Sequence, residues 1–418
     1  MTIATIAGGA GGAGGAGGAG GAGGAGGAGG AGGAGGAGGA GGAGGAGGAG
    51  GGVGAGTSPL LSQALLLAYD GIGGPWAGRT TAVTALPGND RANMDLWPAW
   101  VRSFVIEADL LSRLSYWPFE APGTVPKREE PGIRVCHLSS ADPTLGSPAT
   151  LHPVLELIRP SLPDFEAQLD LVNNYADLRS DRMAEILTQV GFPTPFFASV
   201  AGIQAERNKY TLELISIAQM LAAKVSMVVK HALACKRPDR FSAQIQPIIE
   251  MPGHGTLPSA HAMEAFIVAT VLTRLLEPEG AYSAMLFHQA SRIAVNRTVA
   301  GVHFPADTMA GAMMGVTMGD YMVARAQPTA ETEVKGASFD GRDVGGRDFQ
   351  LSELARAAQS LGAQNPMSAL LPETPPPGGG GDSLEGLVSF DGAAVPVQLS
   401  DLSAPLQWLW GKAREEWA

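Results

Sequence analysis

The sequence predicts a mainly α-helical protein built as a helical bundle, and two observations lead to this prediction. Apolar residues recur at helical spacing through most of the chain after residue 57. Convincing alternation of apolar and polar residues, the pattern of a half-buried strand, is scarce. The two cysteines, Cys136 and Cys235, cannot supply a disulfide framework or a cysteine-based zinc ligand set. We therefore expect one helical domain over residues 57–330, with a tail before it and an extension after it.

The tail covers residues 1–56 and consists largely of repeated Gly-Gly-Ala units. Such a segment has little side-chain surface to bury and much backbone entropy to lose, so we expect it to be disordered. Glycine at every third position matches the collagen period, but no proline is present to favour a triple helix. A flexible tail, or a mis-assigned start codon, is the better interpretation.

The first helices of the domain are predicted from their caps and from periodic apolar positions. One starts at Ser58, where a capping serine and a proline precede a run of leucines. A second covers residues 95–116. Residues 121–148 are rich in proline, glycine and serine and predict a long loop. Helical periodicity returns over residues 164–190 and is strong over residues 205–235.

Three more helices complete the domain, over residues 259–276, 281–297 and 305–325. The composition then changes, and residues 331–418 form a C-terminal extension with a proline- and glycine-rich linker at 372–382. The chain ends in a tryptophan-containing segment, which predicts a short helix that docks on the body of the protein.

Charge and hydropathy exclude several kinds of partner. The net charge of −11 argues against nucleic-acid binding, so an anion site has to be a local basic pocket. Met1 leads directly into the repeat, without the basic and apolar regions of a secretory signal. Lys224, Lys230, Glu264 and Arg274 interrupt the best candidates for a membrane span. We expect a soluble protein without integral membrane association, cytoplasmic by default, with export possible if the true start differs; the sequence leaves its oligomeric state open.

Two cations lie near the end of the helix predicted over residues 205–235. Lys230 and Arg237 are seven residues apart, nearly two helical turns, so both side chains project from one face. Pro238 ends the helix directly after Arg237. An ammonium point charge and a planar guanidinium fork together suit a phosphate-like dianion. The alternative is a basic helix C-terminus that complements its own dipole, although this explains Lys230 less well.

A loop with a histidine leads into the helix predicted over residues 259–276. Because a helix N-terminus offers unpaired N–H groups and a positive dipole end, the amides of Ser259 and Ala260 could donate to an oxyanion. His261 would then lie beside that anion as a proton donor or acceptor. The alternative is a capping serine followed by a surface histidine, and this piece alone favours the alternative.

A third piece lies at the start of the helix predicted over residues 305–325. Gly301 breaks the preceding helix, and Asp307 follows His303 by four residues, so its carboxylate can hold the imidazole across one turn. A carboxylate-held histidine suits a nucleophile or a ligand nitrogen, because its tautomer is fixed. The alternative is a local Asp–His bond that caps the helix, and this piece alone does not decide between the two.

The three pieces, in this order, resemble the type 2 phosphatidic acid phosphatase/vanadium-dependent haloperoxidase superfamily. Its pattern is K-x6-R-P, then P-S-G-H, then S-R-x5-H-x3-D. Lys230–Pro238 fits the first element, Pro258–His261 fits the second, and Arg297, His303 and Asp307 fit the third. The resemblance covers the chain between the first and the last of these residues.

Two positions depart from the pattern. Ala260 stands where the family has glycine, and it adds a Cβ where glycine allows a close backbone approach. Asn296 replaces serine, and both residues are short and polar. The resemblance implies the helical bundle of the acid phosphatase/vanadium haloperoxidase type, with its motif-bearing core over residues 205–327.

The resemblance also implies one of two chemistries, and a haloperoxidase-like enzyme is the first interpretation. In that branch His303 is the metal ligand of a bound vanadate, and Asp307 orients it. His261 handles the protons of hydrogen peroxide, and Lys230 polarises the peroxide so that a halide is oxidised and a small organic acceptor reacts. The residues implied to hold the vanadate are Lys230, Arg237, Ser259, Ala260, Arg297 and His303.

A phosphatase is the second interpretation. A phosphate monoester then occupies the same site, so phosphate competes with vanadate. His303 is the nucleophile that forms a phospho-histidine, and His261 protonates the leaving alcohol. A third interpretation is a non-catalytic descendant that binds phosphate, which Ala260 favours.

Three features favour the haloperoxidase-like branch. The lack of spanning helices argues against the membrane lipid phosphatases of the family. The helical sequence before Lys230 is longer than a minimal soluble acid phosphatase carries. His254 lies seven residues before His261, where bromide- and iodide-using members of the family carry a second pocket histidine and chloride-using members tend to carry an aromatic residue. The alternative for His254 is a solvated loop histidine.

Overall fold

The computed structural model describes most of the chain after the Gly-Gly-Ala tail. The described residues are 59–72, 94–122, 129–139, 149–276, 280–327, 333–371, 384–397 and 403–418. The predictions for the tail at 1–56 and the linker at 372–382 therefore fall outside them. The chain divides into two compact units, Met1–Phe104 and Val105–Ala418, and each is described by itself.

The first unit contains α4 (Pro59–Ile72), which starts at the predicted Ser-Pro pair. A short 3-10 helix, Met94–Leu96, precedes α5 (Ala99–Ser112). The helix α5 runs from the first unit into the second and ends before residue 116, where the sequence predicted its end, because the chain turns into a strand at Leu114.

The second unit confirms the predicted helices in order. The helix expected over residues 164–190 is divided in two by a 3-10 turn at Ala176–Leu178. The helices are α6 (Leu162–Tyr175), α7 (Arg179–Thr188), α8 (Thr194–Ala201), α9 (Lys209–Leu233), α10 (Ala260–Leu276), α11 (Gly280–Val299), α12 (Pro305–Ala326), α13 (Leu351–Ala357) and α14 (Ala404–Glu415). Further 3-10 helices cover Pro238–Arg240, Ala358–Gln364 and Ser368–Leu370.

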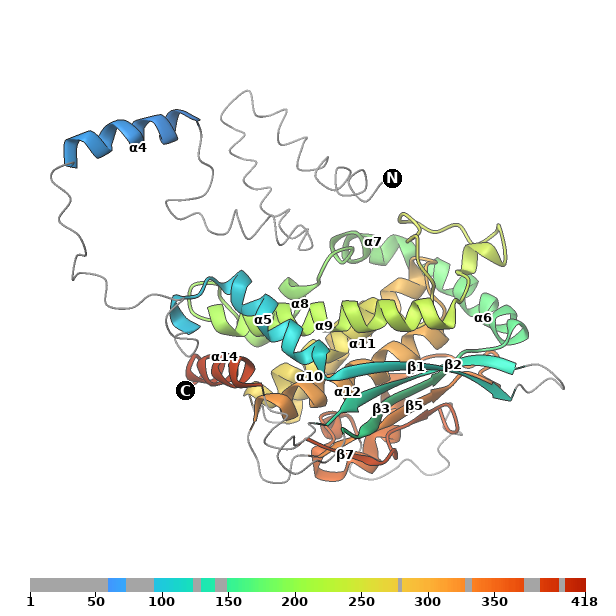
Figure 1. Ribbon diagram of the computed structural model, residues 1–418. Helices are drawn as coiled ribbons and strands as arrows, with labels where there is room; N and C mark the ends of the chain where they lie inside the picture. Colours follow the sequence, from blue (N-terminus) through green and yellow to red (C-terminus); the bar gives the residue numbers. More distant parts are fainter. Residues whose placement is uncertain are drawn as a thin grey trace. The chain divides into compact units, whose positions relative to one another are not determined.

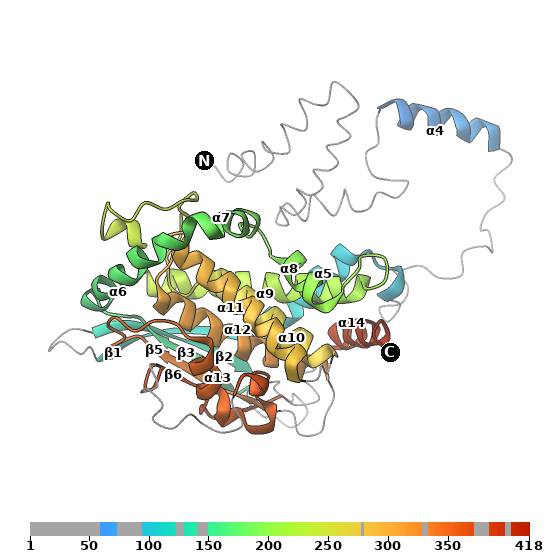
Figure 2. The same ribbon diagram turned by 180° about the vertical axis from the view of Figure 1, so that it is seen from behind.

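The centre of this unit is α10, which packs against α9, α11 and α12 (Figure 2). Most of its side chains are fully buried, as expected for a helix that is apolar on all sides. Glycines at every fourth position of α12 allow it to approach α10 closely. A Cβ on Gly311 would lie 2.4 Å from the carbonyl oxygen of Ser259, and a Cβ on Gly315 would lie 2.6 Å from that of Met263. This close contact places the N-terminus of α10 against the N-terminal half of α12.

The structure is mostly helical, as predicted, but it also contains a β-sheet that the prediction of a helical bundle did not include. Its five strands are β1 (Leu114–Pro122), β2 (Glu129–Leu138), β3 (Leu151–Ile158), β5 (Ala337–Asp340) and β6 (Val388–Ser389), in the order β1-β2-β3-β5-β6. Neighbours are antiparallel except for β3 and β5, which are parallel. A separate antiparallel pair joins β4 (Glu333–Lys335) and β7 (Ala394–Pro396).

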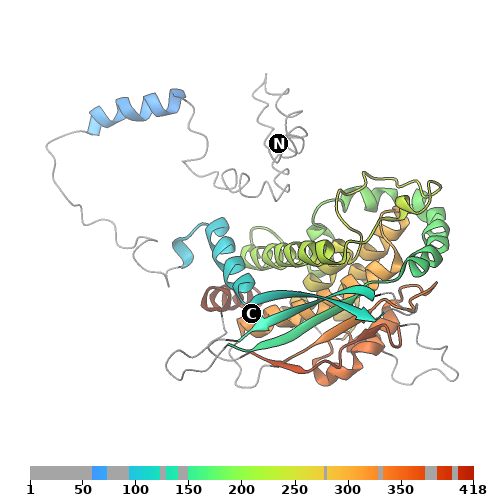
Figure 3. The same cartoon turned by 45° about the vertical axis from the view of Figure 1, so that its right-hand side comes forward.

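The prediction of a long loop over residues 121–148 is wrong where β2 runs. Pro131 and Gly132 in β2 are residues that strands disfavour, and they led to the loop prediction. In the structure, Ile133 and Val135 are fully buried. Figures 1 and 3 show the strands together on one side of the helices, where β2 contacts α9, and β3 and β5 contact α12. Burial against these helices outweighs the low strand propensity of the two residues.

The C-terminal helix confirms the docking predicted from its tryptophans, because α14 packs against α9. One described helix, Lys209–Arg240, is long and apolar enough to cross a membrane by length and composition. The sequence had predicted no such run, since charged residues were counted as interruptions. Of the most apolar 18-residue stretch of this helix, 61% is buried inside the protein, which is typical of the core helix of a packed domain.

Candidate functional site

Lys230 lies in the last turn of α9 and is only 2% exposed. Its ammonium group donates to the carbonyl oxygens of Gly255 at 3.1 Å, Thr256 at 2.8 Å, and Pro258. An ammonium has three protons, so the loop before α10 uses all of them. Burial and the neighbouring Arg237 lower the pKa of Lys230 to about 7. Lys230 therefore shapes this loop, and it has to release a carbonyl oxygen in order to bind an anion.

Arg237 links the first motif piece to the third and to the loop that precedes the second. It follows α9 in an extended backbone conformation, directly before the 3-10 helix at Pro238–Arg240. Its Nε donates to the carbonyl oxygen of His254 at 3.1 Å. Its Nη1 donates to the carbonyl oxygen of Val302 at 2.6 Å and to Nε2 of His303 at 3.2 Å. The guanidinium is buried, and it holds the loop before α10 against the junction before α12.

His303 and Asp307 make the contact that their spacing predicts. The Nδ1 of His303 donates to Oδ2 of Asp307 at 2.9 Å. The same oxygen accepts from the Thr256 hydroxyl at 2.5 Å and from the Phe304 amide at 2.9 Å. This arrangement leaves the lone pair of His303 on Nε2, toward Arg237.

Burial controls the protonation of this pair. It places the pKa of His303 well below its ordinary value, and Arg237 and Lys230 lower it further. The imidazole is therefore neutral at neutral pH. Burial also raises the pKa of Asp307 to about 6, against the hydrogen bonds from Thr256 and Phe304. The pair is suited to present a neutral, oriented nitrogen for bond formation.

The N-terminus of α10 differs from the prediction at one amide. The N–H of Ser259 donates to the carbonyl oxygen of Asp307 at 2.8 Å, so it is engaged by α12. The hydroxyl of Ser259 accepts from the Ala262 amide at 3.3 Å and caps the helix. The Ala260 N–H has no acceptor among the described residues. Ala260 also lacks the positive φ that would require glycine, so the alanine is accommodated without backbone strain.

His261 is partly buried in the first turn of α10. Its Nε2 donates to the carbonyl oxygen of Gln189 at 2.9 Å and lies 3.3 Å from that of Val190. Burial lowers its pKa to about 3, and Arg297 contributes to this shift. We use the word pocket for the group formed by Lys230, Arg237, Ser259–His261, Arg297, His303 and Asp307. His261 is therefore neutral when this pocket holds no anion. An incoming anion would oppose both effects and raise its pKa, as an acid–base residue requires.

Arg297 lies near the end of α11 and is 1% exposed. Its Nη2 donates to the carbonyl oxygen of Ile186 at 3.2 Å and to Oε1 of Gln189 at 3.4 Å. Its Nε and Nη1 have no acceptor among the described residues. Burial lowers its pKa to about 10, so it remains a cation at neutral pH. Unpaired, buried guanidinium N–H groups are the donors that an oxyanion would satisfy.

His254 is exposed and lies beside Arg237. Its Nδ1 is 3.2 Å from Nη2 of Arg237. Burial lowers the pKa of His254, and Lys230 is the next largest cause. The structure therefore brings His254 to one of the cations of the pocket, where its side chain can contact what Arg237 binds.

Sequence reasoning missed three residues of the pocket. Thr256 holds Asp307, and Gln189 contacts both His261 and Arg297. Glu264 is 6% exposed, and burial raises its pKa to about 8, against the charges of Lys230 and Arg297. The sequence could have indicated Glu264, because it follows His261 by three residues and both therefore lie on one face of α10. Gln189 gave no such indication, because it comes from the distant end of α7.

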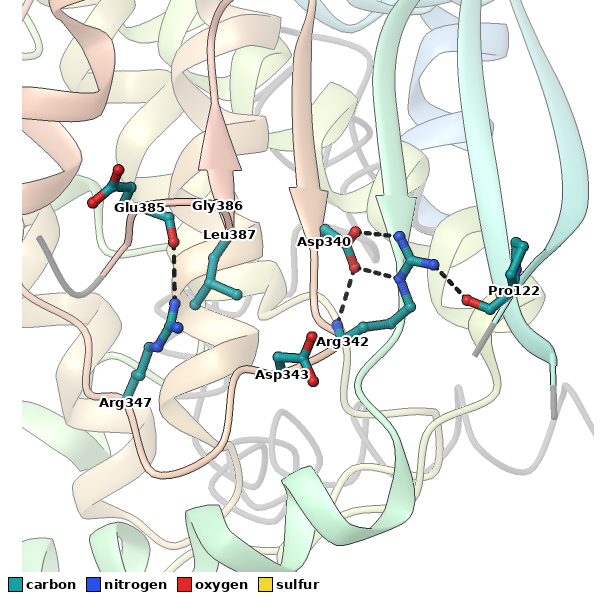
Figure 4. A pocket seen from close by; sticks show the side chains of 8 residues that line it. All are labelled: Pro122, Asp340, Arg342, Asp343, Arg347, Glu385, Gly386 and Leu387. Atoms are coloured by element: carbon teal, nitrogen blue, oxygen red, sulfur yellow. Dashed lines mark hydrogen bonds and ion pairs between the residues drawn. The ribbon is translucent and has the colours of Figure 1, made fainter. Parts of the chain in front are cut away.

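A hollow about 490 Å³ in volume lies elsewhere in the protein and shares no residue with the three motif pieces (Figure 4). Arg342 forms a 2.5 Å ion pair with Asp340 and donates to the carbonyl oxygen of Pro122. Arg347 donates to the carbonyl oxygen of Glu385 at 3.1 Å. Protein groups engage both cations, and among the described residues neither of them carries a buried unpaired donor as Arg297 does.

Comparison with known families agrees with the position of the pocket. Residues 212–329 match the family model of the PAP2 superfamily. The matched stretch runs from the first turn of α9 beyond the end of α12 and contains all three motif pieces. No curated protein matches the chain. The PAP2 superfamily has an α-rich fold and is generally enzymatic, with phosphatases among its members.

Proposed function

We propose that the chain is an enzyme that binds a tetrahedral oxyanion in this pocket, and that it is a haloperoxidase-like enzyme when the anion is vanadate. One observation supports this above the others. A neutral His303 carries its lone pair on Nε2, and two buried N–H groups of Arg297 have no acceptor among the described residues. The histidine provides a nitrogen for bond formation, and the unpaired donors favour negative charge beside it.

The residues present fit vanadate. Its vanadium would be held by His303, and its oxygens by Arg297, the Ala260 amide and the Ser259 hydroxyl. Arg237 and Lys230 would contribute positive charge beside them. Bound vanadate supplies a Lewis-acid centre that activates hydrogen peroxide for the oxidation of a halide. The side chains would orient and bind this group, and His261 would hold or accept protons beside it. Phosphate has the same shape and charge, so it competes for the pocket.

His254 supports the haloperoxidase branch. The residue is exposed and its imidazole reaches Arg237, so a halide or an acceptor entering the pocket would pass close to it. Substitution of His254 should therefore change the preference between halides more than it changes the affinity for phosphate.

Phosphate-monoester hydrolysis is the second candidate, and the PAP2 match supports it. Nε2 of His303 would attack phosphorus, forming a P–N bond as the P–O bond to the alcohol breaks. The departing alkoxide would take a proton from His261. Water would then hydrolyse the phospho-histidine, with His261 now accepting a proton. The donors of Arg297 and the Ala260 amide would stabilise the negative charge that develops.

One preparation assayed in two ways tests both candidates. After vanadate loading, bromination is measured with hydrogen peroxide and bromide; without vanadate, hydrolysis of a phosphate monoester is measured. Bromination that is lost in His303→Ala supports the first candidate. Hydrolysis that vanadate inhibits, without bromination, replaces the first candidate by the second. Phosphate binding with neither activity would leave the non-catalytic descendant, and unchanged activity in His303→Ala would contradict the site itself.

A further inference from the structure

We propose that Gln189 is an additional donor to the bound oxyanion, and that it also positions Arg297 and His261; this inference rests on the proposed function of the pocket. Gln189 follows α7 and lies outside all three motif pieces. Its backbone N–H donates to the carbonyl oxygen of Glu185 at 2.9 Å, which closes the helix. Its side chain is 0% exposed, so it faces the interior of the protein.

Gln189 contacts two of the motif pieces. Its Oε1 accepts from Nδ2 of Asn296 at 2.9 Å and from Nη2 of Arg297 at 3.4 Å. Its backbone oxygen accepts from Nε2 of His261 at 2.9 Å. One residue therefore holds a cation of the pocket and the proposed acid–base histidine in position together.

The two side-chain bonds also determine which way the amide points. Because both neighbours are donors, the oxygen of Gln189 has to face them, and neither of them engages its Nε2 group. That Nε2 is buried and has no acceptor among the described residues, as is also true of Nε and Nη1 of Arg297. Buried N–H groups without acceptors are rare in native proteins. Three of them on two contacting side chains indicate a ligand rich in acceptors, and phosphate and vanadate have this chemistry.

Contacts between α7 and α11 fix the position of Gln189. The helix packs against α11 (Figure 2). Arg182 on α7 donates to Oδ1 of Asn296 at 3.0 Å, and Glu185 pairs with Arg292 at 2.6 Å. These contacts hold the end of α7, and therefore Gln189, beside Arg297. The oxyanion pocket thus includes a donor from a helix outside the segment that matches the PAP2 family.

The variant Gln189→Glu tests this placement. It keeps an oxygen for Arg297 and Asn296, but it replaces the Nε2 donor by a carboxylate oxygen that repels an anion. Phosphate and vanadate are titrated into the full chain by calorimetry. We expect the affinity for phosphate to fall by about 100-fold at neutral pH. The loss should diminish at lower pH, where the introduced carboxyl is protonated, and a purely structural role of Gln189 would not produce this recovery.

Gln219 provides the matched control. It is also buried, its Oε1 accepts from the Thr194 hydroxyl at 3.1 Å, and its Nε2 has no acceptor among the described residues. It precedes Lys230 by eleven residues on α9, a distance of about 16 Å along the helix. Gln219→Glu should therefore lower the melting temperature but leave the affinity for phosphate within about 2-fold, since the new charge is remote.

The outcomes separate this inference from the proposed function. A Gln189→Glu protein that binds phosphate as tightly as the wild type, or a Gln219→Glu protein that is weakened equally, would overturn the role of Gln189. If Gln189→Glu does not fold, Gln189→Ala replaces it, with an expected loss of about 10-fold and with unchanged affinity as the contrary result. A wild-type protein that binds neither phosphate nor vanadate would remove the oxyanion pocket, and Gln189 with it.

Discussion

A single carboxylate oxygen, Oδ2 of Asp307, determines the state of His303. It accepts from the imidazole, from the Thr256 hydroxyl and from the Phe304 amide, so it cannot rotate away without losing three bonds. Because the carboxylate can only accept while it is ionised, His303 has to carry its proton on Nδ1. The reactivity of Nε2 therefore depends on Asp307.

Asp307→Asn should abolish turnover while it retains most of the anion binding. The amide nitrogen of the variant can donate to Nδ1 of His303, which stabilises the tautomer with its proton on Nε2 and removes the nucleophilic lone pair. We expect kcat to fall by about 10³–10⁴-fold, with phosphate affinity within about 10-fold of the wild type. Thr256→Val is the comparison, since it removes one bond to the carboxylate and leaves the tautomer in place. Equal losses in the two variants would contradict this role of Asp307.

Glu264 should make stability depend on pH. Burial raises its pKa from 4.5 to about 8, so folding takes up a proton between these values. The free energy of unfolding contributed by this group therefore falls as pH rises through that window. Glu264→Gln removes the effect, and its melting temperature should equal that of the wild type at about pH 5 and exceed it by about 3 °C at pH 8.

Lys230 and Arg297, the charged groups that act on Glu264, are present in both proteins, so the difference in melting temperature isolates the carboxyl. A difference that stays constant from pH 5 to pH 8 would mean that Glu264 is ionised throughout in the folded state. The same pair of proteins shows whether the carboxyl opposes the bound anion, since phosphate should then bind Glu264→Gln more tightly at high pH.

The residues of the pocket differ in how far the sequence could predict them. The contact of Asp307 with His303 follows from helical spacing, and so does the shared face of His261 and Glu264. No local sequence pattern predicts that Gln189 belongs to the site, because its contact with Arg297 depends on how α7 packs against α11. The engagement of the Ser259 amide by Asp307 likewise depends on the close approach of α10 and α12.

At the scale of elements, the glycines of α12 control the geometry of the site. Gly311 faces Ser259 and Ala262 at the start of α10, and Gly319 faces the side chain of Thr270 further along. Neither glycine has a positive φ, so they are required for the close contact between the helices and not for their own backbone conformation. Any added side-chain atom has to separate α10 from α12.

Gly311→Ala and Gly319→Ala should therefore differ in function. The new Cβ would lie 2.4 Å from the Ser259 oxygen in the first variant and 2.7 Å from the Thr270 side chain in the second. Each should lower stability by about 1–3 kcal/mol, measured by chemical denaturation. Only Gly311→Ala should also weaken phosphate binding, because it displaces the N-terminus of α10. Equal affinity in the two variants would show that this contact does not control the pocket.

The strands show where element prediction from the sequence fails. The helices after residue 205 have long, periodic apolar patterns, and the structure confirms them. In the sequence of β2, the alternating Ile133 and Val135 indicate a half-buried strand, but they follow a Pro-Gly pair typical of turns. Its partners β1 and β3, and the helices behind it, stabilise it through contacts that are distant in the sequence.

At the scale of the whole molecule, the residues after 330 pack with the helices before them. The strand β5 pairs with β3, and Glu416 accepts from the amides of Tyr210 at 2.8 Å and Thr211 at 2.9 Å. These amides belong to the first turn of α9, whose N-cap residue Asn208 makes no capping side-chain bond. Glu416 thus takes the role of a cap and places a negative charge at the positive end of the helix that carries Lys230.

Glu416→Ala should lower the free energy of unfolding by about 1–2 kcal/mol, because it leaves the amides of Tyr210 and Thr211 without their acceptor. Glu415→Ala is the matched control, since Glu415 is 70% exposed and its ion pair is with the neighbouring surface residue Lys412. It should change stability by less than about 0.5 kcal/mol. Denaturant titrations of both variants measure the difference, and equal effects would mean that the C-terminus does not stabilise α9.

The central claim is that the motif pieces form one oxyanion pocket around Nε2 of His303. A crystal structure of the full chain with bound vanadate tests it most directly. We predict vanadium bonded to Nε2 of His303, with vanadate oxygens accepting from Arg297, the Ala260 amide and Gln189. Vanadate bound only elsewhere, or held in this pocket without a bond to His303, would contradict the account.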